Sequence, residues 1–257
     1  MKKILLASGI LIAAAVVFIV SGSAFAAHPL ITDDTGTQGK GKFQLEVNAE
    51  YAHDSNDGVT TEETTPAAAI SYGITDTMDI VLGMPYLSWS VKDTSGKTSE
   101  NGVSDASVDL KWRFYEHEGL SFALKPGATL PTGDDKKGLG NGKATYHMFF
   151  ITTKELKPWA FHMNLGYIRN ENKGDDRKDL WHVSAATEVE LVKDLKFVAD
   201  IGMERTPDKT SSIDPAYILG GLVYSLTEHF DIDFGIKGGL NKAEPDYALL
   251  AGITLRF

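Results

Sequence analysis

The chain has 257 residues, among them 25 lysine or arginine, 35 aspartate or glutamate and no cysteine. This length holds one large domain or two small ones. The formal net charge of −10 argues against binding to nucleic-acid phosphates. Without cysteine, the chain has no disulfide framework, thiolate chemistry or lipoprotein attachment site.

The first residues have the three parts of a secretory signal peptide. Two lysines give a positive start, an apolar run covers 4–20, and small residues surround Ala26 and Ala27. An uncleaved anchor helix is the alternative, but the run is near the lower length limit for a membrane span. We therefore expect 1–26 to be a signal peptide for Sec-type export, and 27–42 to form a polar, turn-rich periplasmic arm.

From Phe43 to the end, apolar and polar residues alternate in runs that are separated by turn-rich segments. Between Phe43 and Tyr51, every second side chain is apolar and those between are Gln, Glu or Asn. Strand side chains point alternately to two faces, so this pattern predicts a strand with one apolar face. Eleven further strands are predicted over 61–74, 78–91, 103–115, 120–130, 143–153, 157–168, 179–191, 195–205, 216–226, 230–240 and 246–257.

The predicted connections alternate between short and long. Short turns are expected at 75–77, 116–119, 154–156, 192–194 and 227–229. Longer loops are expected at 54–60, 92–102, 131–142, 169–178, 206–215 and 241–245. This alternation is typical of outer-membrane barrels, which have tight periplasmic turns and longer external loops. A β-sandwich has no reason to alternate in this way.

Aromatic side chains on the apolar faces gather near both ends of the predicted strands, as expected for two membrane interfaces. After residue 26, no stretch approaches the ~20 apolar residues of a membrane helix. The sequence therefore predicts an all-β fold, a single twelve-stranded antiparallel transmembrane β-barrel over 43–257, located in a bacterial outer membrane. A soluble sandwich with the same strands is the alternative.

In such a barrel the polar side chains of each strand, which occupy every second position, face the lumen. The charged and histidine side chains expected to line it are Glu46, Glu50, Asp109, Lys111, Arg113, Lys125, His147, His162, His182, Glu188, Asp200, Asp231, Asp233, Lys237 and Arg256. These charges can pair across the wall or set a field along a pore. The three histidines lie on successive strands, but zinc requires ligands at ~2 Å with fixed partners, so we expect neither a metal site nor a cofactor.

The segment His28–Thr37 (HPLITDDTGT), followed by Gly41–Glu46 (GKFQLE), resembles the opening of a known family. This family is labelled as the putative MetA pathway of phenol degradation and is often described as transporters. The resemblance implies an outer-membrane barrel and passage of aromatic or other hydrophobic compounds. For such cargo we expect an inward apolar patch around Phe149, Ile151, Leu219 and Val223.

The function expected from these features is passive passage of small molecules through the lumen. Asp33 and Asp34 in the arm either dock on lumen lysines or arginines or belong to a disordered tail, and 131–142 either folds inward as a constriction or stays exposed. We expect contacts with outer-membrane lipid, and with the barrel-assembly machinery through the last strand and Phe257. The oligomeric state stays open.

Two other classes of function remain. A phospholipase-like barrel requires a serine activated by a histidine that a third group orients, and no serine lies in a G-x-S-x-G motif. A closed structural or adhesive barrel requires no chemistry at all. We expect a channel rather than an enzyme.

Overall fold

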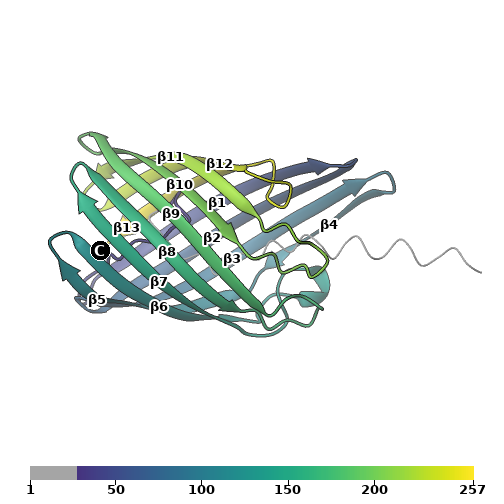
Figure 1. Ribbon diagram of the computed structural model, residues 1–257, viewed down its shortest axis with the longest axis horizontal. Coiled ribbons are helices and arrows are strands. Elements are labelled where there is room, and N and C mark those ends of the chain that lie inside the picture. Colours follow the sequence, from purple (N-terminus) through teal and green to yellow (C-terminus); the bar gives the residue numbers. More distant parts are fainter. Residues whose placement is uncertain (1–27) are drawn as a thin grey trace, which may run out of the picture.

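The computed structural model describes residues 28–257, so the predicted signal peptide lies outside the described residues. The described part contains thirteen strands and one 3-10 helix (Figure 1). These elements are β1 (Phe43–Asn56), β2 (Val59–Thr75), β3 (Met78–Asp93), β4 (Gly96–Val103), β5 (Ala106–His117), β6 (Leu120–Leu130), η1 (Asp135–Lys137), β7 (Thr145–Leu156), β8 (Trp159–Arg169), β9 (Asp179–Val192), β10 (Leu195–Glu204), β11 (Ala216–Thr227), β12 (Phe230–Gly239) and β13 (Tyr247–Arg256).

All strands pair antiparallel in one sheet that closes on itself. Each strand from β5 to β13 pairs with the next, β13 pairs with β1, and β1–β2 and β2–β3 complete the circle. The first half of β3 pairs with β5 and its second half pairs with β4, so β4 and β5 occupy one place in the wall. The predicted twelve-stranded barrel is confirmed. Closure satisfies the backbone groups that lipid would leave unpaired.

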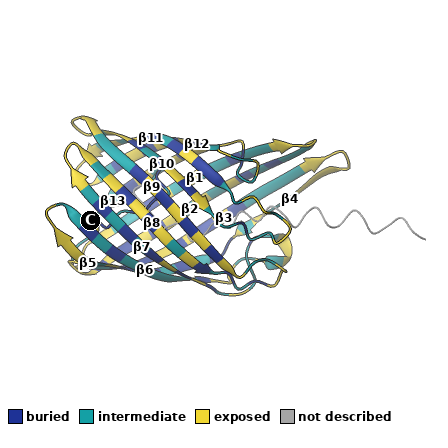
Figure 2. Ribbon diagram, viewed as in Figure 1, coloured by how far each residue is buried: buried dark blue, intermediate teal, exposed yellow. Residues whose placement is uncertain are grey.

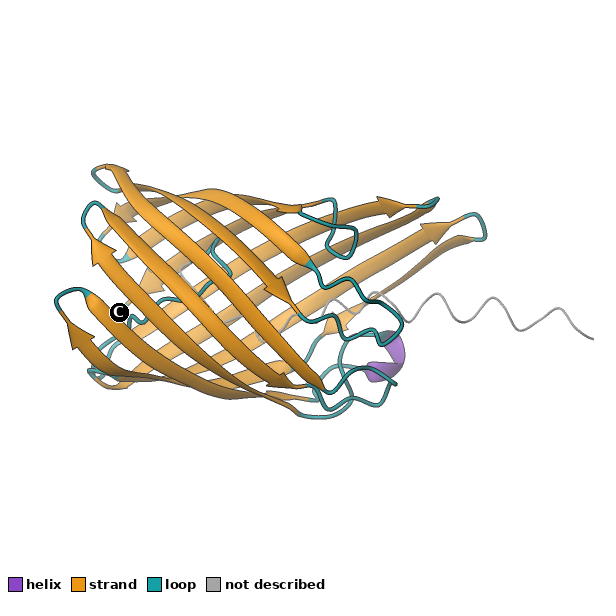
Figure 3. Ribbon diagram, viewed as in Figure 1, coloured by secondary structure: helices purple, strands orange, loops and turns teal. Residues whose placement is uncertain are grey.

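The two ends of the barrel differ (Figure 3). Five connections at one end have two residues each: 76–77, 118–119, 157–158, 193–194 and 228–229. We call this end the turn rim and the opposite end the mouth. At the turn rim the first and last strands meet, since Phe43 N–H donates to the Phe257 carbonyl at 3.1 Å and Phe257 N–H donates back at 2.9 Å.

Two of the six long loops predicted at the mouth are wrong. Residues 54–60 form a hairpin whose turn is Asp57–Gly58, with φ of 51° and 82°. Residues 92–102 lie mostly in the β3–β4 hairpin. Both hairpins project from the mouth (Figure 1). The polar composition suggested loops, but the paired backbones satisfy one another, and Asp-Gly favours a two-residue turn with positive φ.

The outward and inward faces have opposite chemistry, and burial alternates along most strands of the wall (Figure 2). Outward side chains are apolar and exposed, for example Leu82 at 48%, Leu165 at 46% and Phe234 at 50%. Inward side chains are largely charged or polar and buried, including Lys125 and Asp79. This distribution suits a hydrocarbon surround and a polar interior. Among residues 28–257, no helix is long and apolar enough to cross a membrane.

Candidate functional site

The arm, residues 28–42, turns into the barrel from the start of β1. At its base, Gly41 N–H donates to the Gly73 carbonyl at 2.8 Å, and Gly73 N–H donates to the Lys42 carbonyl at 3.0 Å. A Cβ on Gly73 would lie 1.9 Å from the Gly39 carbonyl oxygen. Glycine at position 73 is therefore required for this close approach.

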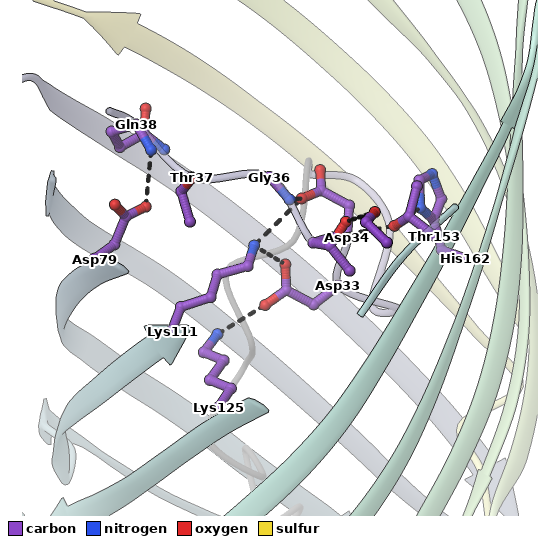
Figure 4. A network of polar contacts seen from close by, with 12 residues as sticks. Asp33, Asp34, Gly36, Thr37, Gln38, Asp79, Lys111, Lys125, Thr153 and His162 are labelled. Carbon is purple, nitrogen blue, oxygen red and sulfur yellow. Dashed lines mark hydrogen bonds and ion pairs between the residues drawn. The ribbon is translucent and has the colours of Figure 1, made fainter. Parts of the chain in front are cut away.

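The centre of the arm is held by two buried lysines on neighbouring strands (Figure 4). The Asp33 carboxylate receives Lys111 Nζ on one oxygen at 2.9 Å and Lys125 Nζ on the other at 3.0 Å. The side chains of Asp33 and Lys125 are each 1% exposed. Charges so deeply buried are tolerated only when they are paired. We call Asp33, Lys111 and Lys125 the carboxylate clamp.

Residues beside the clamp fix the arm's backbone. Asn164 on β8, in the amide orientation that satisfies both groups, accepts from the Asp33 N–H at 2.6 Å and donates to its carbonyl at 2.9 Å. Lys111 Nζ also lies 3.2 Å from Asp34. Burial acts to raise the pKa of Asp34, but the positive charge of Lys111 and that of His162 outweigh it and hold the pKa below its ordinary range. Asp34 is therefore a carboxylate at neutral pH.

The N-terminal half of the arm crosses to the opposite wall. The Asp200 carboxylate on β10 accepts from the backbone N–H groups of Ile31 and Thr32, at 2.8 and 2.7 Å, and from the Thr32 hydroxyl at 2.7 Å. Leu30 packs in a cluster with inward Val198, Tyr217, Leu219 and Leu250 among others.

The end of the arm is seated against the last strands. The Pro29 ring packs closely on two glycines. A Cβ on Gly221 would lie 2.6 Å from this ring, and a Cβ on Gly235 would lie 2.8 Å from it. His28 pairs with Asp233 on β12. The arm therefore crosses the lumen from β2 to β12, and its docking on lumen lysines replaces the disordered alternative.

Most of the other predicted lumen residues pair with one another. Lys237 on β12 binds Glu50 on β1 at 2.9 Å. It also binds Glu244, which lies in the loop after β12, at 3.1 Å. Further pairs are Arg256–Asp231 at 2.7 Å, Lys196–Glu188 at 2.8 Å and Arg113–Glu116 at 3.2 Å. Glu46 differs, because neither of its carboxylate oxygens has a hydrogen-bond partner among residues 28–257.

The three histidines have separate partners. His147 Nε2 lies 2.5 Å from Asp109, and His162 lies 2.9 Å from the Thr153 hydroxyl and 3.5 Å from Glu188. His182 lies 3.0 Å from the Ser184 hydroxyl and, through its other nitrogen, 3.2 Å from Glu204. Within residues 28–257, no three ligating side chains converge on a possible metal position.

The Ser184–His182–Glu204 chain has the order of a nucleophile, a base and an orienting acid. Its serine, however, is 3% exposed and lies on the lumen side of β9, away from the apolar exterior. A lipid ester on the outer surface would not reach it. The chain is therefore described more simply as a hydrogen-bonded link in the wall.

The predicted inward apolar patch is divided into two clusters. Phe149 and Ile151 pack with Ala123, Ile168 and Leu180. Leu219 belongs to the cluster around Leu30, with Val223 packed against it. The arm therefore covers one of the two apolar surfaces inside the barrel.

Three loops form a connected cover at the mouth. The Asp105 carboxylate accepts from Gly133 N–H and Asn141 N–H, both at 2.8 Å, which holds residues 131–144 against the wall. Lys173 bonds Asp135 at 2.9 Å and joins the next loop to η1. The guanidinium of Arg177 donates to backbone carbonyls of the third loop, at Thr206, Asp208, Lys209 and Ser211.

Several residues at this site were absent from the sequence-based prediction. Tyr217 shares the parity of Leu219, so its inward position follows from the same alternation. The role of Asn164 has no such signal, because an inward asparagine on β8 is equally suited to bind water. Thr32 and Thr35 lie in the irregular arm, where no period indicates which side chain meets the wall. The Thr35 N–H donates to the Thr153 hydroxyl at 3.1 Å, and the Thr35 hydroxyl lies 2.5 Å from that of Ser121.

The sequence profile of the family described as Putative MetA-pathway of phenol degradation matches residues 26–257, so the chain belongs to this family. No curated protein is similar enough in sequence to count as a relative. Similar solved structures include the NanC porin (TM-score 0.56, 10% identity, 82% of this chain and 98% of that one). The KdgM porin has a TM-score of 0.53 and 9% identity, and the match covers 82% of this chain and 99% of that one. The translocator domain of autotransporter NalP from Neisseria meningitidis has a TM-score of 0.52 and 10% identity, and the match covers 85% of this chain and 89% of that one. Likeness at this identity concerns the fold.

Proposed function

We propose that this member of the family is an outer-membrane channel for small molecules, in which the arm obstructs the lumen and moves to let cargo pass. The apolar exterior and closed wall support a membrane location. Of the three similar structures named above, two are described as porins. The observation that carries the proposal is the buried arm itself, because Thr32 and Asp33 are each 1% exposed inside a polar lumen.

The arm is suited to movement because it is attached by side-chain contacts rather than as a strand of the sheet. Above its base at Gly73, three parts of the wall hold the arm. Lys111 and Lys125 bind Asp33, Asp200 binds Thr32, and the Thr153 hydroxyl accepts from the Thr35 N–H. A wall whose strands are all paired without the arm does not need it for closure.

Single-channel conductance tests this proposal. Deletion of residues 29–38 removes the crossing segment and keeps the base near Gly39, so conductance in planar bilayers should rise well above that of the complete mature chain. A full-length variant with Gly220→Ala is the control, since a Cβ there meets nothing within 4 Å. Equal currents from the deletion variant and protein-free bilayers would leave a closed structural or adhesive barrel as the better description.

The finer proposal concerns the cargo, for which we favour compounds with an apolar or aromatic body. Phe149, Ile151 and Leu180 lie on the inner side of the wall and pack in a buried apolar cluster within a largely polar lumen. Vesicles containing the protein should therefore take up an aromatic tracer faster than empty vesicles, and Ile151→Asn should slow this uptake. Uptake that is equal with and without the protein would count against apolar cargo.

Two further assays concern the alternatives and the assembly partner. Phospholipid micelles should show no ester hydrolysis beyond that of a Ser184→Ala variant, and activity lost in that variant would favour an enzyme. Phe257 is 68% exposed at the turn rim. We propose that it is recognised by the assembly machinery, so Phe257→Ala should lower the amount of barrel in outer membranes.

A further inference from the structure

The two lysines around Asp33 provide a complete binding position for a carboxylate. We propose that Lys111 and Lys125 form a site for a small carboxylate, which Asp33 occupies in this structure and which carboxylate-bearing cargo occupies during passage. The last step rests on the proposed channel function. The site itself is defined by the clamp, whether or not cargo crosses the barrel.

The geometry of the clamp is that of a bound anion. Each oxygen of Asp33 receives one ammonium group, at 2.9 Å from Lys111 and 3.0 Å from Lys125. The lysine side chains are 8% and 1% exposed. Ammonium groups removed from water to this extent require a counter-ion. When Asp33 moves away, these ammonium groups lose that counter-ion and leave a position that fits an external carboxylate.

The wall at this point also depends on an anion. The pairs Asp109↔Gly127 and Trp112↔Leu124 on β5 and β6 place Lys111 opposite Lys125, with both side chains inward. Like charges directly opposite one another destabilise a sheet. The pairing is interrupted between these two pairs, where Pro126 has no N–H to donate. A simple tether for the arm would need one lysine, whereas two facing lysines are suited to a carboxylate.

The surroundings of Lys125 indicate what the carboxylate would carry. Lys125 pairs with Phe149 across β6 and β7, and Ala123 pairs with Ile151 two positions further. These three apolar residues belong to one buried cluster. A charged head at the lysines and an apolar body along this cluster describe a small aromatic or aliphatic monocarboxylate, rather than a sugar acid with many hydroxyl groups.

Two carboxylates of the chain compete for the same lysines. Asp34 lies 3.2 Å from Lys111 and would leave with the arm. Glu46 on β1 is 1% exposed and within electrostatic reach of Lys111, Lys125 and Asp33. If Glu46 turned to the lysines once Asp33 was removed, the site would close and no external carboxylate would bind. The test below includes this outcome.

Chemical rescue of Asp33→Ala tests the site. The mature protein in detergent is unfolded thermally in sodium acetate or sodium chloride at equal ionic strength, with acetamide in chloride as the neutral comparison. The variant should unfold about 5 °C or more below the wild type in chloride, because it leaves the buried Lys125 without its partner and Lys111 with Asp34 alone. Acetate should restore at least half of this shift, and benzoate should do so at lower concentration, whereas acetamide should not.

The double variant Asp33→Ala/Lys125→Met is the matched control and should show no response specific to acetate. The proposal is overturned if Asp33→Ala behaves alike in acetate and chloride, including the case in which Glu46 has replaced Asp33. It is also overturned if the double variant responds as strongly as the single one. If Asp33→Ala does not refold in chloride, refolding yield replaces the midpoint: recovery in acetate supports the site, and equal failure in both salts overturns it.

Conductance distinguishes this inference from the channel proposal. Acetate rescue in a protein that carries no current, even without its arm, would support the site and count against the channel. If the arm-deleted barrel carries current and Asp33→Ala shows no response to carboxylates, the channel would be supported and the carboxylate site would be contradicted.

Discussion

The arm crosses the lumen and the cover joins three loops at the mouth, and the two are held by different kinds of contact. The arm is fixed by buried charges, with the Asp33 and Lys125 side chains each 1% exposed. The cover is fixed at one loop by the Asp105 carboxylate, which is 7% exposed. Its other contacts are exposed charges, such as Lys209 and Asp175 at 48% and 97%, and backbone carbonyls around Arg177. Water screens the second kind of contact and not the first.

The difference indicates that the arm contributes to the free energy of unfolding, whereas the cover affects only entry to the lumen. Removing one partner of a buried pair leaves an uncompensated charge, whereas an exposed pair returns to water at little cost. We therefore expect arm variants to change both unfolding and conductance. Variants of the cover should change the mobility of the mouth loops and leave unfolding almost unchanged.

The largest effect is expected for Lys125→Met. Asp33 would keep only Lys111, and its second oxygen would be buried without a partner, so the free energy of unfolding should fall by about 3–5 kcal/mol. Urea unfolding in detergent measures this change. Lys209→Met at the mouth is the control and should have the same midpoint as the wild type. Similar losses in both variants would contradict the comparison.

A smaller effect is expected where the arm meets the last strands. Gly221→Ala would place a Cβ 2.6 Å from the Pro29 ring and 2.7 Å from the Phe234 carbonyl oxygen. Overpacking of this kind costs about 1–3 kcal/mol. Gly220→Ala, next to it, meets nothing within 4 Å and should be neutral. Thermal unfolding of the two variants, which differ by one position, measures the tightness of this seat.

The cover is tested by Arg177→Ala. Loss of its guanidinium removes the donors to the four carbonyls in 206–211, so limited proteolysis should cut this loop several times faster than in the wild type. The midpoint of unfolding should stay unchanged because the strands are untouched. A large fall in that midpoint would mean that the cover stabilises the barrel as the arm does.

The smallest effect is expected from acid. The pKa of Asp34 is held below its ordinary value of about 3.8 by Lys111, against the effect of burial. A depressed folded-state pKa gives stability that is present above about pH 4 and is lost as the pH falls towards the folded value. Asp34→Asn should therefore lower the free energy of unfolding at pH 7. Below pH 4 the difference in this free energy between the variant and the wild type should become smaller. A constant gap would show that Asp34 gives no charge-dependent stability.

Alternation predicted the strands, because a strand that faces lipid on one side and a polar lumen on the other alternates from residue to residue. The short and long connections and the positions of the aromatic side chains then favoured a barrel over a sandwich. The same rule gives the parity of Lys111 and Lys125. It does not indicate which charges meet, since the height of each residue in the wall depends on strand register, and register depends on the type and length of the connecting turns.

The errors at the mouth have a physical reason. Residues 92–102 are polar on both faces, and such a pattern is equally suited to a loop or to a hairpin surrounded by water. For 54–60, Asp57–Gly58 was the available signal for a tight turn. The arm lacks periodicity, so only its charges indicated a contact, and the partners of Thr32 and Thr35 could not be predicted.

The seam between β1 and β13 joins the earliest strand to the latest one, and Phe43 and Phe257 exchange two hydrogen bonds where they meet. The arm directly precedes that earliest strand and crosses to β10 and β12, which are made almost last. The circle therefore closes around a segment that must already be threaded inside, or that must enter afterwards through an open end. A bulky folded domain at the tip of the arm would separate these two routes. If the arm must be inside before closure, the seam between β1 and β13 should fail to form, and if the arm enters afterwards, the barrel should close with the arm outside.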